Sequence, residues 1–370
     1  MNNIETAIQF VKRPLKEQLG LDVTFREGYG VDFFPQFIKG MNEIWYDKKL
    51  ETLLWLYNMV FHGKGLTSKT ITHYQLFYAC LNSEKYDQAE KHLLAFEEDV
   101  KKVQPDGETN DEIINQLTFI LFHELYHVIF YSKPDVKEKA LASERQRQTE
   151  IKEELEQMLK TITPEEIFAM PKVQPRIKAL FTSFVTKSMK KKIVGYIIDG
   201  LVKPEDYDAK VLGDDSSLLE EMACDRNAWQ YIMEICKSTE ASKEDLADIH
   251  CSLLIALTAM FVNEAFHAHY FPEKHANFSY DAKTVIIRQN SFKRLDQYIP
   301  IEYKDVSGEY LHVTEQVEKV YRESVESFVR YKGDIGEIYG GSEDNQPKTE
   351  SWTEYNDRMH KIVQSIGVSL

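Results

Sequence analysis

Two histidines and a glutamate in one short segment have the residue types and the spacing of a metal site. Residues 123 to 127 read His-Glu-Leu-Tyr-His, so that His123 and His127 are four positions apart. Such positions lie on one face of a helix about a turn apart, where both imidazoles could bind the same zinc ion. Glu124, the next residue round the helix, could act as general base for a water molecule that the metal activates. The motif predicts a zinc hydrolase, specifically a metallopeptidase.

The residues around this motif have the pattern of a helix with one apolar face. Residues 109 to 112 form a capping box, and the run from residue 113 to residue 131 is rich in apolar residues and lacks proline and glycine. Steps of three and four residues along this run give a largely apolar stripe that contains both histidines. The stripe consists of Ile113, Gln116, Ile120, His123, His127 and Phe130. Two core histidines with ordinary hydrogen bonds are the alternative interpretation, but ligand spacing beside a glutamate favours a metal.

A second segment could supply the third ligand, because a catalytic zinc usually takes three protein ligands and keeps one position for water. A helix is predicted to begin at Ser217, with Glu220 three residues later. Its apolar stripe consists of Leu218, Glu221, Asp225, Ala228, Ile232 and Ile235. Buried carboxylates are costly unless they are paired or bind metal. We therefore predict Glu221 as a ligand and Asp225 as the hydrogen-bond partner of a ligand imidazole.

Two other interpretations of this segment stay open. Glu220 could be the ligand, although it lies about 100 degrees round the helix and has no acid four residues later. Glu221 and Asp225 could instead form ion pairs with Arg226 or a lysine on a half-exposed helix. The HExxH motif upstream favours the metal site.

At this point the chain resembles the zincin metallopeptidases, in particular the gluzincins, whose third ligand is the glutamate of an ExxxD helix. His123, Glu124 and His127 match the first motif, and Glu221 and Asp225 match the second. The resemblance implies zinc ligation by the two histidines and Glu221, a general base at Glu124, and Asp225 behind a ligand. The segment from residue 224 to residue 228 also looks like intracellular bacterial peptidases of the phage-exclusion (Lit) type, which would imply a role in phage defence.

Peptide hydrolysis also needs a group besides the metal that stabilises the oxyanion. Tyr270, His275 and Arg288 are the candidates, and their segment loosely resembles the His-Pro and Arg segment that follows the ExxxD helix in some zincins. Loop histidines are more often solvated or capping than catalytic, so a structural role is the alternative.

Composition and charge set the broad class of the protein. The chain of 370 residues is 43% hydrophobic and 12% aromatic, which is enough to bury a large core. The N-terminus lacks the pattern of a signal peptide, and the apolar stretch from Cys251 to Val262 is short for a bilayer span and predicts a buried helix. A net charge of −15 argues against nucleic-acid binding. Four cysteines without CxxC spacing suggest a reducing compartment, with Cys224 a buried, inert thiol. We expect a soluble cytoplasmic protein without a membrane or nucleic-acid partner.

The remaining patterns predict an α+β, mainly helical fold that is zincin-like, with a small N-terminal sheet and a helical insertion. The predicted strands are 23–25, 31–34 and 42–47, and zincins pair extended substrate with an edge of such a sheet. The predicted helices are 50–61, a helical pair or single tetratricopeptide-like hairpin over 72–96, 134–160, 164–200 with breaks, 314–331 and 352–366. The predicted regions are 1–105, a catalytic core over 106–300 with the insertion at about 134–216, and a C-terminal region over 301–370 with a flexible connection at about 333–351.

The sequence thus predicts a zinc peptidase acting on an intracellular protein or peptide. Two rivals stay open, a helical interaction protein with a structural or vestigial metal site and a metal hydrolase that does not cleave peptides.

Overall fold

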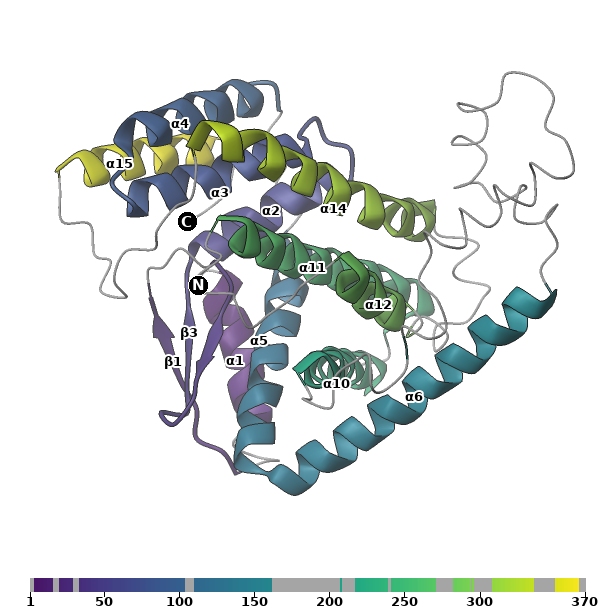
Figure 1. The fold of residues 1–370 in the computed structure, drawn as a ribbon. Coiled ribbons are helices and arrows are strands. Elements are labelled where there is room, and N and C mark those ends of the chain that lie inside the picture. The colour runs from purple at the N-terminus through teal and green to yellow at the C-terminus, as the bar shows by residue number, and fades with distance from the viewer. Residues whose placement is uncertain are drawn as a thin grey trace, which may run out of the picture. The chain divides into compact units, whose positions relative to one another are not determined.

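The structure is a computed structural model, and it describes most of the chain outside several gaps. The described residues are 3–15, 20–28, 33–103, 110–161, 207, 217–238, 241–270, 282–293, 295, 308–335 and 350–365. Within them the fold is mainly helical with one small sheet near the N-terminus (Figure 1), which confirms the predicted α+β class. The predicted helical stretch at 164–200 lies outside the described residues.

The sheet has three short strands, β1 Thr24–Glu27, β2 Gln36–Ile38 and β3 Glu43–Tyr46, in the order β1-β3-β2. The central strand β3 pairs in parallel with β1 and antiparallel with β2, with Phe37 opposite Ile44. The predicted strand at 42–47 is confirmed, and the one at 23–25 overlaps β1. Strand β2 lies at an edge of the sheet.

The strand predicted at 31–34 is wrong over its described part. Phe33 and Phe34 have irregular backbone, and the strand begins only at Gln36, after a proline that has no N–H to donate. Both phenylalanine side chains are buried. The two side chains anchor a connecting segment in the core, so their apolar character does not indicate a strand.

Packing divides the chain into two compact units. The first comprises Met1–Pro134, Cys224–Tyr280 and Phe292–Leu370, and the second comprises Asp135–Ala223 and Asp281–Ser291. The helices of the first unit are α1 Asn3–Pro14, α2 Lys49–Phe61, α3 Ser68–Asn82, α4 Tyr86–Val100, α5 Asn110–Ser132, α11 Lys243–Tyr270, α14 Gly308–Ile335 and α15 Glu350–Ser365. Helix α10, Ser217–Ser238, is continuous across the boundary, so its first turns are assigned to the second unit and the rest to the first.

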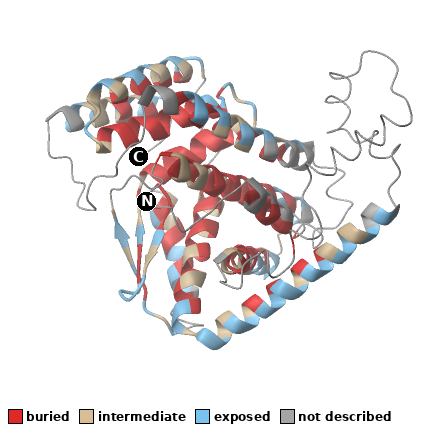
Figure 2. Ribbon diagram, viewed as in Figure 1, coloured by how far each residue is buried: buried red, intermediate tan, exposed pale blue. Residues whose placement is uncertain are grey.

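Helix α11 forms the centre of the first unit. It packs against α5, α14 and α2, and Figure 2 shows it as almost continuously buried. Every residue from Cys251 to Val262 is buried, so the predicted buried helix is confirmed and extends well beyond that stretch. A helix that is apolar on all sides is stable only when other elements surround it.

Two helices of this unit are long and apolar enough to pass a test for membrane spans based on length and composition. They are α5 over Asp111–Ser132 and α11 over Glu244–Tyr270. Buried residues make up 67% of the tested window in α5 and 83% in α11, as in the core helices of a globular unit.

The N-terminal helix α1 was not predicted and packs on α5. A residue far along the chain stabilises its first turn, because the carboxylate of Glu51 on α2 accepts a hydrogen bond from the backbone N–H of Ile4 at 2.8 Å. Acceptors at a helix N-terminus satisfy amides that have no partner within the helix. Helix α1 thus depends on a contact with a residue far along the chain.

The helices predicted in the middle and C-terminal parts of the chain are largely confirmed. Helices α3 and α4 form the predicted helical pair, and α14 and α15 pack on α3 and α4 respectively. Helix α14 continues to Ile335, so the predicted connection at 333–351 begins inside a helix; its residues 336–349 lie outside the described part of the chain.

The described helices of the second unit are α6 Pro134–Thr161, α12 Ala282–Lys293 up to residue 291, and the start of α10. Helix α6 is largely exposed but buries Leu141 and Ile151, which confirms a charged helix packed along one narrow side. Gln148 on α6 donates to the hydroxyl of Ser291 on α12 at 2.9 Å. Lys137 and Glu220 form an ion pair of 2.6 Å between α6 and α10.

Candidate metal centre

The two histidines of the HExxH motif lie on the inner face of α5. The predicted stripe is buried at Ile113, Gln116, Ile120, His123 and Phe130, and half-buried at His127. Helix α5 begins at Asn110, and the predicted cap at Thr109 lies outside the described residues. The period of the apolar residues therefore sets the orientation of the motif, because it fixes which side of α5 faces the core.

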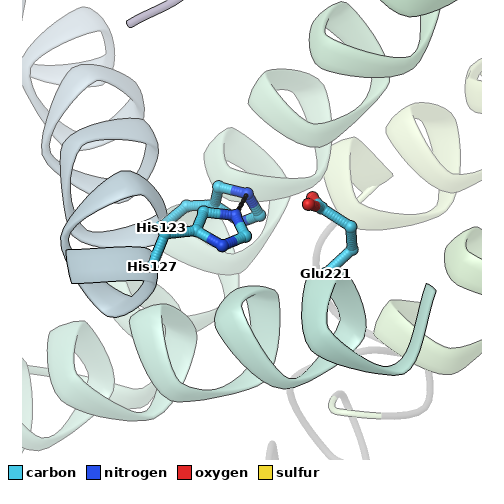
Figure 3. Close-up of side chains that lie close together, drawn as sticks. All are labelled: His123, His127 and Glu221. Carbon is cyan, nitrogen blue, oxygen red and sulfur yellow. Dashed lines mark hydrogen bonds between the residues drawn. The ribbon is translucent and has the colours of Figure 1, made fainter. Parts of the chain in front are cut away.

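The ring geometry fits a shared ligand. His123 Nε2 and His127 Nε2 are 3.3 Å apart, and Figure 3 shows the two imidazoles side by side. Two nitrogens bound at 2.0–2.1 Å to one tetrahedral zinc would be about 3.3 Å apart. The rings thus already have the separation that a common ion requires.

The outer nitrogen of His123 faces an acid on α10. Asp225 Oδ1 lies 2.9 Å from His123 Nδ1, and both side chains are almost fully buried, at 4% and 2% exposure. A carboxylate at this position holds the proton on Nδ1 and so leaves Nε2 as the ligand atom. The predicted contact of Asp225 with an imidazole of the motif is therefore present, and the role of that imidazole as a ligand stays a prediction.

Glu221 lies one turn before Asp225 on the same continuous helix and completes the group. Ligand atoms of His123, His127 and Glu221 all lie within 4.8 Å of one another, and this group could hold a metal ion. Figure 3 shows the Glu221 carboxylate directed towards the two rings. Two imidazole nitrogens and a carboxylate oxygen form a donor set typical of catalytic zinc.

The neighbouring Glu220 is directed elsewhere. Its carboxylate binds Lys137, whereas that of Glu221 is 3.1 Å from the guanidinium of Arg288 through Oε2. Arg288 is fully buried, and a buried guanidinium is stable only when it is paired. A carboxylate has two oxygens, so the contact with Arg288 is compatible with metal ligation through the other. Of the two glutamates, the structure brings Glu221 to the histidines, as predicted.

Glu124 is held by the edge of the sheet. Its Oε2 accepts the backbone N–H of Phe37 on β2 at 2.9 Å. Because this amide is directed at Glu124 on α5, it points away from β3. Phe37 therefore forms a non-hydrogen-bonded pair with Ile44, and its amide lies on the outer edge of β2. The general-base candidate thus lies beside the outer edge of β2.

The structure shows a contact that the sequence interpretation missed. Cys224 Sγ lies 3.7 Å from His127 Nδ1, within hydrogen-bonding distance for sulfur. The thiol was expected to be buried and inert, and it is buried. The one hint in the sequence was the position of Cys224 directly before Asp225. If Asp225 contacts one histidine of α5, the neighbouring residue of α10 can reach the next turn of α5.

The structure describes two of the three predicted oxyanion candidates, Tyr270 and Arg288. Tyr270 is fully buried, and its hydroxyl donates to the carbonyl of Phe328 on α14 at 2.9 Å. Arg288 is at the candidate ligand Glu221, as described above. His275 lies outside the described residues. The catalytic role of all three stays a prediction.

Tyr126, inside the motif, is a neutral hydroxyl near this centre. Burial raises the pKa of Tyr126 well above its ordinary value, and the neighbouring Tyr231 and Cys224 raise it further. Its phenol therefore stays protonated throughout the physiological range.

Comparison of the chain with protein-family models, with curated proteins and with solved structures gives no match. The interpretation of this centre accordingly depends on its own geometry.

Proposed function

We propose that this protein is a zinc-dependent peptidase whose centre is formed by His123, His127 and Glu221. The observation that carries the proposal is the 3.3 Å separation of the two Nε2 atoms beside a glutamate that belongs to a second helix. The donor set of two imidazoles and one carboxylate suits zinc, and the several carboxylates that Mg²⁺ or Ca²⁺ prefer are not part of the group. Zinc would supply a Lewis acid that polarises the scissile carbonyl and favours ionisation of water.

Glu124 would move the proton. Its carboxylate accepts a proton from the attacking water while the water oxygen bonds to the carbonyl carbon, and later passes that proton to the leaving nitrogen as the C–N bond breaks. Its half-buried place beside the histidines on α5 supports this role. The amide of Phe37 fixes the position of this carboxylate in the structure.

A peptide is the substrate that the surroundings of the centre favour. The outer edge of β2 reaches Glu124, and an extended peptide can add to a strand edge through main-chain hydrogen bonds. Main-chain recognition places a peptide carbonyl, and not an arbitrary ester or phosphate, beside the base. This proximity supports peptide hydrolysis over other metal-dependent hydrolysis.

The proposal is tested by metal analysis followed by comparison of Glu124→Gln with the wild type. We expect about one zinc per chain in both proteins, because Glu124 is not a ligand, and loss of turnover in the variant alone. Turnover is measured as new protein termini after incubation with a proteome extract. Glu234→Gln, on an exposed side of α10, is the matched control and should cleave as the wild type does.

Zinc content below about a tenth of an equivalent would reject the metal centre and favour an interaction protein. Equal numbers of new termini with the wild type and Glu124→Gln would reject Glu124 as the base.

A further inference from the structure

The two histidines of the candidate centre each have a partner on the side away from the other ring. His123 Nδ1 faces Asp225, and His127 Nδ1 faces Cys224. These partners are consecutive residues of α10, and the histidines are one turn apart on α5. Consecutive positions on a helix diverge by about 100 degrees, so two neighbouring side chains of α10 can reach two successive turns of α5.

We propose that Cys224 is a positioning residue that holds the ring of His127 for metal binding through Nε2. The proposal rests on the zinc centre proposed above and deepens it, because it assigns a role to a thiol that touches neither the metal nor the substrate. It also accounts for a fully buried thiol beside a polar ring on α5.

The position of the proton on His127 determines which atom donates in the hydrogen bond between His127 and Cys224. A neutral imidazole that binds metal through Nε2 carries its proton on Nδ1, so Nδ1 must donate. The atom that it faces is Cys224 Sγ, which is therefore the acceptor. Metal on Nε2 sets the tautomer of His127 in the loaded centre, and the hydrogen bond from Nδ1 to the sulfur would hold the plane of the ring.

The location of the thiol rules out direct ligation of the same ion by sulfur. Cys224 lies on the Nδ1 side of the ring, whereas the Nε2 atoms of His127 and His123 face each other at 3.3 Å. An ion held by both Nε2 atoms is on the far side of the imidazole from the sulfur. Cys224 can therefore act on the metal only through His127.

The chemistry of the Cys224 sulfur sets how much its removal should change zinc affinity. Partners of this kind typically change metal affinity by about 10- to 100-fold when they are removed. A neutral sulfur accepts a hydrogen bond more weakly than the charged Asp225 does. We therefore expect removal of the thiol to weaken zinc binding by about tenfold, at the lower end of that range.

The first experiment measures zinc affinity by competition with a chromophoric chelator in the full chain. Cys224→Ala removes the acceptor, and Cys224→Ser keeps an acceptor, an oxygen, on the same carbon. Cys80→Ala, at an equally buried cysteine of α3, is the control for loss of a buried thiol in general. Thermal unfolding of the metal-free proteins verifies that each variant is folded.

We expect about tenfold weaker zinc binding for Cys224→Ala, a smaller loss for Cys224→Ser, and wild-type affinity for Cys80→Ala. Wild-type affinity in a folded Cys224→Ala protein that still binds one zinc would overturn the positioning role and leave the proposed peptidase intact. Failure of the wild type itself to bind zinc would instead remove the proposed function, and the role of Cys224 with it.

The second experiment uses the wild-type protein, so its result does not depend on whether a variant folds. Nitrogen-15 NMR of the histidine-labelled, zinc-loaded wild type reports which nitrogen of His127 carries the proton. We expect the proton on Nδ1 and the metal on Nε2. Metal on Nδ1 of His127 would overturn the proposal, because the sulfur would then face a nitrogen without a proton to donate.

Discussion

Three side chains define the centre, and each is held by a different kind of neighbour. A carboxylate lies behind His123, a thiol behind His127 and a guanidinium behind Glu221. The spacing of His123 and His127 made their approach predictable, because any helix brings positions four apart together. The thiol contact was not predictable, since spacing alone does not separate a buried cysteine packed among apolar groups from one that faces a ring nitrogen.

The choice between the adjacent glutamates of α10 leads to a prediction at this scale. Glu221→Gln should weaken zinc binding by more than about 100-fold, which is beyond the usual effect of a residue behind a ligand. Glu220→Gln, its neighbour, should leave affinity unchanged because Glu220 is paired with Lys137. Chelator competition compares the two variants under identical conditions. Equal losses in both would show that the third ligand has been assigned wrongly.

At the scale of elements, the spacing of apolar residues predicted the helices that bury one face. It did not predict elements whose position depends on contacts with residues far away in the sequence. Helices α5 and α10 begin close to where their patterns predicted, although Ile235, the last residue of the α10 stripe, is exposed at 41%. Helix α1 was missed because its first turn depends on Glu51, which is far from it in the sequence. The strand expected at 31–34 was misplaced because aromatic residues were interpreted as strand formers when they anchor a loop.

The junction of α3, α4 and α14 contains an element-level feature that depends on pH. His73 Nδ1 and His92 Nδ1 are 2.9 Å apart, and the Tyr331 hydroxyl is 3.3 Å from His73 Nε2. Burial, together with the nearby charge of Lys69, lowers the pKa of His73 to about 4, although Asp99 opposes this. The folded protein therefore keeps this ring neutral in a range where the unfolded chain already binds a proton.

Because the folded pKa is below the ordinary value of 6.5, the stability associated with His73 is complete above pH 6.5 and is lost as the pH falls towards 4. The loss should reach up to about 3 kcal/mol at the lower end of that window. Urea unfolding at pH 7 and pH 5 measures it, with His73→Gln as the comparison. The variant should show a shallower pH dependence; an equal slope in both proteins would exclude His73 as the source.

At the scale of the whole molecule, the candidate centre joins α5 to α10, two helices that are far apart in the sequence. An ion bound by residues of both helices is a link that the unfolded chain lacks. Binding to the folded state alone stabilises it in proportion to the logarithm of ligand concentration. The fold class was predictable because most elements bury one apolar face, and the predicted insertion at about 134–216 resembles the main segment of the second unit. That residues 281–291 also pack with this unit depends on contacts between residues far apart in the sequence, which local patterns do not predict.

Zinc should therefore raise the thermal midpoint of the wild type. At a free concentration about 1,000 times the dissociation constant, the stabilisation is about 4 kcal/mol. Scanning fluorimetry with zinc and with a chelator measures the difference, and His123→Ala should show little of it. A zinc-dependent shift of the same size in His123→Ala would place the binding elsewhere in the chain.

For the proposed peptidase, the bond between Glu124 and the amide of Phe37 would affect when the base becomes available. One N–H serves a single strong acceptor, so an incoming peptide that docks against Phe37 competes with the carboxylate for it. Arrival of the peptide would release Glu124 at the moment when a reactive carbonyl is within its reach. Without substrate, the Glu124 carboxylate would thus stay bound to the Phe37 amide, and binding of a peptide at this strand would itself free the base.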